Sequence, residues 1–144
     1  MVFLEIQLRV VTTGNLDECV ALKKESVAYH IAQAKVTPCC WPMGAYLGQD
    51  LIGFVMYGLC PRDGQYWILA LMVGEQYQGL GLERAVLEKV LGILKETMDC
   101  TAVYVRIASE DVAAQTLFFN MGFRWVGGNP PLGGNASACL EVKR

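Results

Sequence analysis

Hydrophobic and polar residues alternate at the start of the chain and then change to a helical spacing. Residues 3–10 alternate apolar and polar side chains, which predicts a first strand. Thr13 or Asn15 is suited to cap the helix that follows, because apolar residues then recur every three or four positions. A second helix is expected over residues 25–35, since Pro38 follows it closely.

Strand patterns dominate the next part of the chain. Residues 44–47 and 51–59 are separated by a short polar turn with a glycine, which predicts a hairpin. A second turn leads into residues 66–73, which are apolar throughout. Such an uninterrupted run is typical of a central strand that is covered on both faces.

The second half of the chain alternates helices and strands. Apolar residues from Leu82 to Leu94 lie along one stripe of a predicted helix, and charged residues occupy its other face. The elements that follow are a strand over 101–108, a helix over 110–121 and a final hairpin over 123–126 and 136–142. The order β-α-α-β-β-β-α-β-α-β-β predicts an α/β protein with a mixed sheet and helices on both faces.

Composition supports a compact protein. With 144 residues, 53% of them hydrophobic and 18% charged, the chain suffices for one well-buried core, so we expect a single domain over residues 1–144. A formal net charge of −2 offers no basic surface for nucleic acid. Residues 1–10 do not resemble a signal peptide, and no apolar run reaches the length of a membrane helix. We therefore expect a cytoplasmic protein without nucleic-acid or membrane partners.

The six cysteines are distributed without a metal-binding pattern. No two of them form a C-x-x-C pair, and the chain contains one histidine. A site with mixed sulfur and nitrogen ligands is therefore not expected. We predict that the cysteines are free thiols and that the protein holds no metal.

A glycine-bearing loop, Gln78-Gly79-Leu80-Gly81, connects the apolar strand to the amphipathic helix. Backbone N–H groups at a helix N-terminus have no intrahelical partners, so this place suits an anion. The loop lacks the lysine of a P-loop, and Arg84 stands where a dinucleotide fingerprint has its third glycine. An ordinary strand-to-helix turn also explains the two glycines.

Several segments resemble the GNAT superfamily of acetyl-CoA-dependent N-acetyltransferases. Leu71-Met72-Val73, followed by Gln78-Gly79-Leu80-Gly81, resembles the family signature Q/R-x-x-G-x-G/A. Residues 113–123, with Ala114, Leu117 and a final Gly-Phe pair, resemble its N-x-x-A-x-x-L-Y-x-x-x-G-F stretch. Residues 52–58 and 63–68 are similar to the bacterial diamine and spermidine acetyltransferases.

The resemblance implies a GNAT-like fold, in which a mostly antiparallel sheet contains a splayed fourth and fifth strand. It also implies a set of residues that bind acetyl-CoA: Leu71, Met72, Val73, Gln78, Gly79, Leu80, Gly81, Leu82, Glu83, Arg84, Asp111 and Phe118. The implied reaction is direct attack of a small molecule's primary amine on the thioester, with a polyamine as one candidate. A homodimer is a further analogy to the family.

Three residues depart from the family pattern. Glu83 takes the place of a glycine or alanine, where it either repels the pyrophosphate or turns to solvent, the orientation that we expect. Phe118 replaces the tyrosine that is thought to protonate the departing thiolate, and is expected to pack on the cofactor or the core. Asp111 replaces an asparagine and is suited to cap a helix.

The general base is not identified by the sequence. An alkylammonium group with a pKa of about 10.4 is neutral in about one molecule in 2,500 at pH 7, so a base would help. Glu75, His30 and Tyr66 are weak candidates, and core packing explains the tyrosine better than a role as base. The alternative function is a weakly active or inactive protein of the same fold that binds or senses an acyl-CoA.

Overall fold

The computed structural model describes residues 5–96, 100–127 and 135–141, which fold into one sheet with helices on both sides. The elements are β1 (Ile6–Val10), α1 (Leu16–Leu22), α2 (Lys24–Val36), β2 (Cys40–Leu47), β3 (Asp50–Leu59), β4 (Tyr66–Val73), the 3₁₀ turn η1 (Glu75–Tyr77), α3 (Leu82–Glu96), β5 (Ala102–Ala108), α4 (Val112–Asn120), β6 (Arg124–Trp125) and β7 (Asn135–Glu141). Their order is the predicted one, with η1 added.

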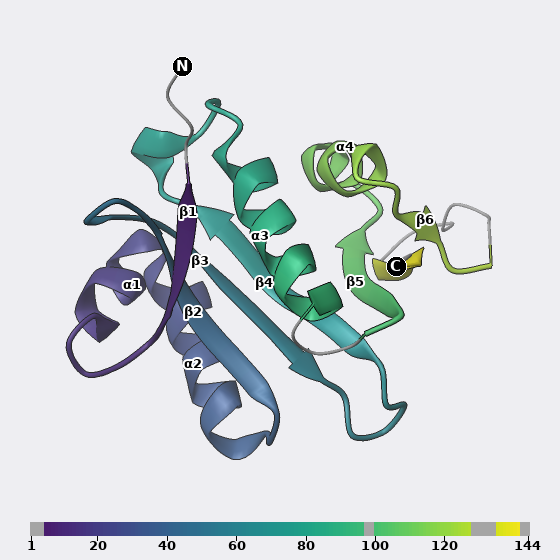
Figure 1. The fold of residues 1–144 in the computed structure, drawn as a ribbon, viewed down its shortest axis with the longest axis horizontal. Helices are drawn as coiled ribbons and strands as arrows, with labels where there is room; N and C mark the ends of the chain where they lie inside the picture. Colours follow the sequence, from purple (N-terminus) through teal and green to yellow (C-terminus); the bar gives the residue numbers. More distant parts are fainter. Residues whose placement is uncertain (1–4, 97–99, 128–134, 142–144) are drawn as a thin grey trace.

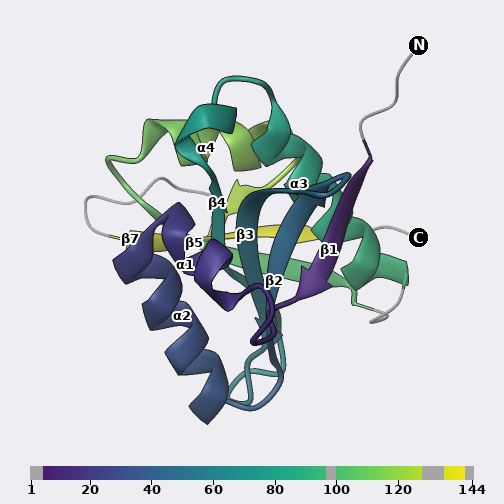
Figure 2. The same ribbon diagram turned by 90° about the vertical axis from the view of Figure 1, so that its left-hand side faces the viewer.

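Within the described residues the sheet has seven strands in the order β1-β2-β3-β4-β5-β7-β6. All neighbours are antiparallel except β4 and β5, which are parallel. In Figure 1 the helix α3 lies in front of the sheet and α1 and α2 lie behind it. Figure 2 shows the same two layers from the side. The predicted mixed sheet with helices on both faces is therefore confirmed.

Two apolar clusters hold these layers together. The larger one packs α3 and α4 on one face of the sheet and contains Leu87, Phe118 and Phe123. The smaller one packs α1 and α2 on the opposite face, where Cys19 and Val27 meet side chains of β3. The strand β3 has fully buried residues in both clusters, because it lies near the centre of the sheet with both faces covered.

Strand β2 begins at Cys40, four residues before the predicted start. The sequence pattern is misleading here because Pro42 cannot donate a backbone hydrogen bond and proline usually interrupts a strand. In the structure β1 ends at Val10, opposite Met43, so Pro42 lies beyond the end of that neighbour. Its carbonyl oxygen still accepts a hydrogen bond from the N–H of Val11 at 3.2 Å.

Predicted helix caps are confirmed in one of two places. Asp111 precedes α4, and its Oδ1 accepts a hydrogen bond from the N–H of Ala114 at 3.0 Å. Asn15 precedes α1 but does not cap it, because its side-chain oxygen accepts instead from the N–H of Thr12 at 2.8 Å. The final hairpin pairs β6 with β7 as expected, and the predicted loop over residues 127–135 lies mostly outside the described residues.

Candidate acyl-CoA cleft

The strands β4 and β5 are hydrogen-bonded partners only near their beginnings. Tyr66, Trp67 and Ile68 pair with residues 103–105, and no further pair joins the two described strands. Beyond Ile68 they diverge toward their C-terminal ends (Figure 1). On its other edge β4 remains paired with β3 as far as Val73. One edge of β4 over residues 69–73 is therefore open to hydrogen bonds with another molecule.

The turn after β4 brings a helix N-terminus to this opening. Gly79 and Gly81 have φ values of +78° and +76°, which other residues adopt at a cost. Beyond the adjacent residues of the turn, no atom lies within 4 Å of where a Cβ would stand at either position, so a ligand has room to approach the backbone. Nε2 of Gln78 donates to the carbonyl oxygen of Val73 at 3.2 Å and braces the turn. The positive end of the α3 dipole then faces the opening.

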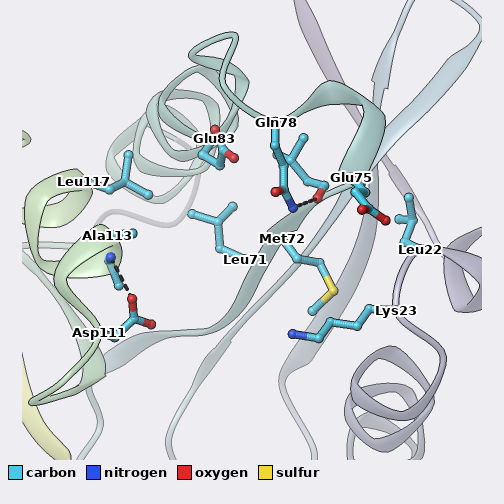
Figure 3. A pocket seen from close by; sticks show the side chains of 12 residues that line it. Leu22, Lys23, Leu71, Met72, Glu75, Gln78, Glu83, Asp111, Ala113 and Leu117 are labelled. Carbon is cyan, nitrogen blue, oxygen red and sulfur yellow. Dashed lines mark hydrogen bonds between the residues drawn. The ribbon is translucent and has the colours of Figure 1, made fainter.

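A cleft of about 770 Å³ lies at this opening. Figure 3 shows its walls, which come from β4, the turn, the start of α3, the helix α4 and the junction of α1 with α2. Its lining residues are Leu22, Lys23, Leu71, Met72, Val73, Glu75, Gln78, Glu83, Asp111, Ala113, Ala114 and Leu117. Apolar side chains form the middle, where Leu71 and Met72 are half-buried.

The structure brings half of the predicted cofactor-binding residues into the cleft wall: Leu71, Met72, Val73, Gln78, Glu83 and Asp111. Gly79, Leu80 and Gly81 form the neighbouring turn and are exposed. The side chain of Leu82 is buried in the core, so only its backbone is available to a ligand. Nε of Arg84 bonds Oε1 of Glu88 at 3.1 Å, one turn further along the helix.

Of the expectations for Glu83 and Phe118, the first is wrong and the second is confirmed. Glu83 is half-buried and lines the cleft, whereas we expected it to turn to solvent. Phe118 is 5% exposed, packs edge-to-face on Phe123 at 5.2 Å, and does not line the cleft. Of the two expectations for Phe118, packing on the cofactor or on the core, the structure confirms packing in the core.

Of the three candidate bases, Glu75 alone reaches the cleft. Tyr66 lies at the paired end of β4 and packs against the larger core cluster. His30 lines a separate hollow of about 760 Å³ beside α2, together with Arg62 and Arg106. Burial lowers the pKa of His30, but its location does not suit the role of base in the cleft.

A second hollow of about 510 Å³ adjoins the cleft and shares Leu22 and Glu75 with it. Its charged lining residues are Glu18, Asp50 and Glu75, and no described cation lines it. In the cleft itself, Lys23 is the cation among the described lining residues, opposed by Glu75, Glu83 and Asp111. The surroundings of the opening are therefore acidic on balance.

Leu22 and Lys23 line the cleft, although the sequence analysis did not assign them to the site. Lys23 interrupts the two helices with φ −164° and ψ 85°, and this break places the α1–α2 junction at the cleft. The gap between the two predicted helices is the signal that could have found them. Ala113 and Leu117 belong to the stretch that resembles the family, and the structure adds them to the cleft wall.

Elsewhere, all six cysteines are free thiols, as predicted. Three or more metal-ligating side chains do not come together anywhere in the described ranges. Among the described helices, none has the length and apolarity needed to cross a membrane.

A parallel strand pair that splits, with a glycine turn and a helix N-terminus at the opening, is the arrangement that the resemblance to acetyl-CoA-dependent N-acetyltransferases implied. Residues 11–123 match the model of the acetyltransferase (GNAT) family, and the chain belongs to that family. Its members take the acetyl group from acetyl-CoA, so this chain is an acetyl-CoA-dependent N-acetyltransferase.

Known proteins similar to the chain agree with this assignment. The spermine/spermidine N(1)-acetyltransferase of Bacillus subtilis is 32% identical over 109 residues, which is 72% of each chain. A spermidine N-acetyltransferase from Vibrio cholerae, solved in complex with CoA and spermine, has a TM-score of 0.77 at 14% identity and 95% coverage of both chains. An acetyltransferase from Thermus thermophilus has a TM-score of 0.75 at 19% identity, covering 96% of this chain and 98% of the other. The last two show the shared fold.

Proposed function

We propose that the protein transfers the acetyl group of acetyl-CoA to a primary amine of a polyamine, by direct attack of the amine nitrogen on the thioester. The observation that carries this proposal is the open edge of β4 beside the glycine turn, which suits a thioester whose carrier also bears an anionic pyrophosphate. The polyamine is supported by the similarity to the Bacillus subtilis spermine/spermidine N(1)-acetyltransferase and by the acidic hollow beside the cleft.

The donor fits the residues that are present. The open backbone edge at Leu71, Met72 and Val73 is suited to hold the pantetheine arm by hydrogen bonds. Residues 79–84 offer backbone N–H groups for the pyrophosphate. Bound acetyl-CoA supplies an activated acyl group. Backbone N–H groups near the end of β4 would stabilise the negative charge that develops on its carbonyl oxygen.

The acceptor needs negative charge around its distant ammonium groups and a deprotonated nitrogen at the thioester. Glu18 and Asp50 provide the negative charge, because they line the hollow and no described cation lines it with them. Glu75 belongs to both spaces, so we assign it the part of proton acceptor, directly or through water. Since a free amine nitrogen is scarce at neutral pH, turnover is expected to rise with pH between about 6 and 9.

The test is turnover with spermidine and with a monoamine of similar length, followed by mass spectrometry of the acetylated product. A thiol reagent is avoided because Cys39 is exposed and would react with it. Glu75→Gln is expected to lower kcat by ~10²-fold or more. Glu96→Gln removes the same charge at the far end of α3 and serves as the control. A monoamine acetylated as efficiently as spermidine would contradict the polyamine assignment.

The alternative, an acyl-CoA-binding protein with little chemistry, is favoured by one observation. Phe118 is buried in the core and has no hydroxyl group to protonate the departing thiolate. A thiol of pKa about 8.5 leaves tolerably without such help, so we prefer the enzyme. Tight acetyl-CoA binding with no acetylated product from any primary amine would favour the alternative.

We further propose that residues 1–144 form one domain and act in the cytoplasm. The family model spans 113 of these residues, from 11 to 123, and both ends of that span lie next to strands of the same sheet. The free state of all six thiols fits a reducing compartment.

A further inference from the structure

The hollow that His30 lines, here called the α2 hollow, is separate from the acyl-CoA cleft and has no part in the proposed reaction. Its volume is about 760 Å³, which is within the ordinary range for a small-molecule site. Its walls come from α2, from the turn between β3 and β4, from the first half of β4 and from β5. The cleft takes the other half of the same strand, from Leu71 to Val73. No described residue lines both spaces.

The α2 hollow exists because the helices on this face cover only part of the sheet. Val27 and Ile31 of α2 pack on buried side chains of β3 in the smaller core cluster. In β5, residues 103, 105 and 107 are buried in the larger cluster on the other face, so Tyr104 and Arg106 point to the face that carries α2. In Figure 1, α1 and α2 lie behind the side of the sheet formed by β1 to β3, away from β5. The space between α2 and β5 is therefore left open.

Two arginines from different elements give the α2 hollow its charge. Arg62 belongs to the turn after β3 and Arg106 to β5, and neither guanidinium group forms an ion pair or a hydrogen bond with a described residue. Asp63 is the acid among the described lining residues, and its Oδ2 accepts a hydrogen bond from Nε1 of Trp67 at 3.3 Å. Burial lowers the pKa of His30, so this ring is mostly neutral at pH 7. The lining therefore carries more positive than negative charge.

Beside the arginines, the α2 hollow has an apolar wall. Trp67 and Leu69 of β4 line it and are half-buried. The Trp67 ring packs on the Tyr104 ring at a centroid distance of 5.2 Å and an interplanar angle of 31°, and its hydrogen bond to Asp63 fixes it further. A ring that is already held in place offers apolar surface to a ligand at little cost in conformational entropy. The lining thus combines an apolar wall with two available guanidinium groups.

We propose that the α2 hollow is a second ligand site, in which Arg62 and Arg106 hold the carboxylate or phosphate group of a small molecule and Trp67 packs against its apolar body. Guanidinium groups suit both anions, because each can donate two parallel N–H bonds to the oxygens of either. The hollow beside the acyl-CoA cleft has an acidic lining and suits a cation. The two spaces therefore select ligands of opposite charge, and the α2 hollow repels a polyamine.

The test is a titration of the full chain, followed through the indole N–H signals of its tryptophans in two-dimensional proton–nitrogen NMR spectra. The probes are benzoate and phenyl phosphate, with benzamide as a neutral probe of similar shape. Each anion should shift the Trp67 signal with a dissociation constant in the millimolar range, which titration to ~20 mM covers. Benzamide should bind at least ~5-fold more weakly, because it carries no charge. Trp41 and Trp125 pack against other rings, so their signals serve as the internal reference.

Charge variants locate the bound probe. Arg62→Gln and Arg106→Gln should each weaken binding of both anions by ~5-fold or more. Both arginines are exposed and have no side-chain partner among the described residues, so neither variant should change the melting temperature. Lys95→Gln removes one positive charge at the exposed end of α3, on the other side of the sheet, and should leave binding unchanged.

Three results would overturn the proposal. They are a Trp67 signal that neither anion moves, benzamide binding as tight as that of the anions, and an affinity that the two arginine variants lower no more than Lys95→Gln does. Phenyl phosphate and benzoate together show which anionic group the α2 hollow prefers. The titration needs neither CoA nor acetyl transfer, so its failure is distinct from a failure of the proposed function.

Discussion

Glu83 offers the sharpest test of how the cleft holds its donor. Its carboxylate lines the cleft at the start of α3, beside the glycine turn that is expected to receive the pyrophosphate of CoA. The family pattern has a glycine or alanine at this position. The substitution Glu83→Gln removes the charge and keeps the size of the side chain, so it isolates the electrostatic effect.

The magnitude follows from Coulomb's law. At ~8 Å, a carboxylate and a doubly charged pyrophosphate repel by ~1 kcal/mol in a water-like dielectric and by ~2 kcal/mol at half that dielectric. Because Glu83 is partly exposed, screening at physiological ionic strength with a Debye length of ~8 Å reduces this to ~0.5–1 kcal/mol. Glu83→Gln should therefore tighten CoA binding by ~2- to 5-fold, and by more at low salt.

Titration calorimetry with CoA and with pantetheine measures this effect. Pantetheine carries the same arm without the phosphates, so its affinity should not change in Glu83→Gln. Glu96→Gln, which removes the same charge at the other end of α3, should leave both affinities unchanged. Repulsion between Glu83 and the pyrophosphate is refuted if Glu83→Gln fails to tighten CoA binding at low salt, or if it changes the affinity for pantetheine equally.

The remaining predictions concern stability and the core. Gly53→Ala should lower the free energy of unfolding by ~3 kcal/mol, because a Cβ there would stand 2.5 Å from the carbonyl oxygen of Met72. A Cβ at Gly92 would have no atom within 4 Å beyond its own helix backbone, so Gly92→Ala should instead stabilise the protein by ~0.5–1 kcal/mol. Chemical denaturation measures the free energy of unfolding of both variants. Phe118→Tyr should destabilise the fold by ~1–3 kcal/mol without raising kcat, since its hydroxyl group would be buried away from the cleft; a higher kcat would contradict this. Burial raises the pKa of Cys19 from 9.0 to about 11, so the native state retains a proton that the unfolded state loses, and stability should fall as the pH rises from 9 to 11. In Cys19→Ala, the melting temperature should fall less between pH 9 and 11 than it does in the wild-type protein.

Much of the fold could be predicted from residue patterns. The limits of β4 match the apolar run 66–73, and α3 matches the one strongly amphipathic segment. Local patterns suffice in these places because each element buries a face with its own period. They fail at Pro42, where the position of a neighbouring strand decides whether a proline is tolerated. The position of that neighbouring strand is set by the tertiary fold and not by the local sequence.

The site could be predicted in outline but not in its side chains. The split of β4 from β5 was expected from the family resemblance, because no residue pattern distinguishes a paired strand from a half-paired one. The side-chain direction of Glu83 depends on how the glycine turn orients the first residues of α3, and the sequence alone does not set that orientation. Lys23 enters the cleft because two helices break there, and only the packed structure shows how they meet.

The charged side chains around the cleft are mostly acidic, although the acetyl donor, acetyl-CoA, is itself highly anionic. Lys23 lines the cleft together with three carboxylates, and Arg84 pairs with Glu88, so side-chain cations are expected to contribute little net attraction. In the binding mode that we propose, affinity would come from backbone N–H groups at the α3 N-terminus and from the apolar strand edge at Leu71. Both depend on backbone geometry rather than on charge. Such a binding mode is consistent with the positive φ values of the glycines at the turn, and it would keep the cost of Glu83 small without removing it.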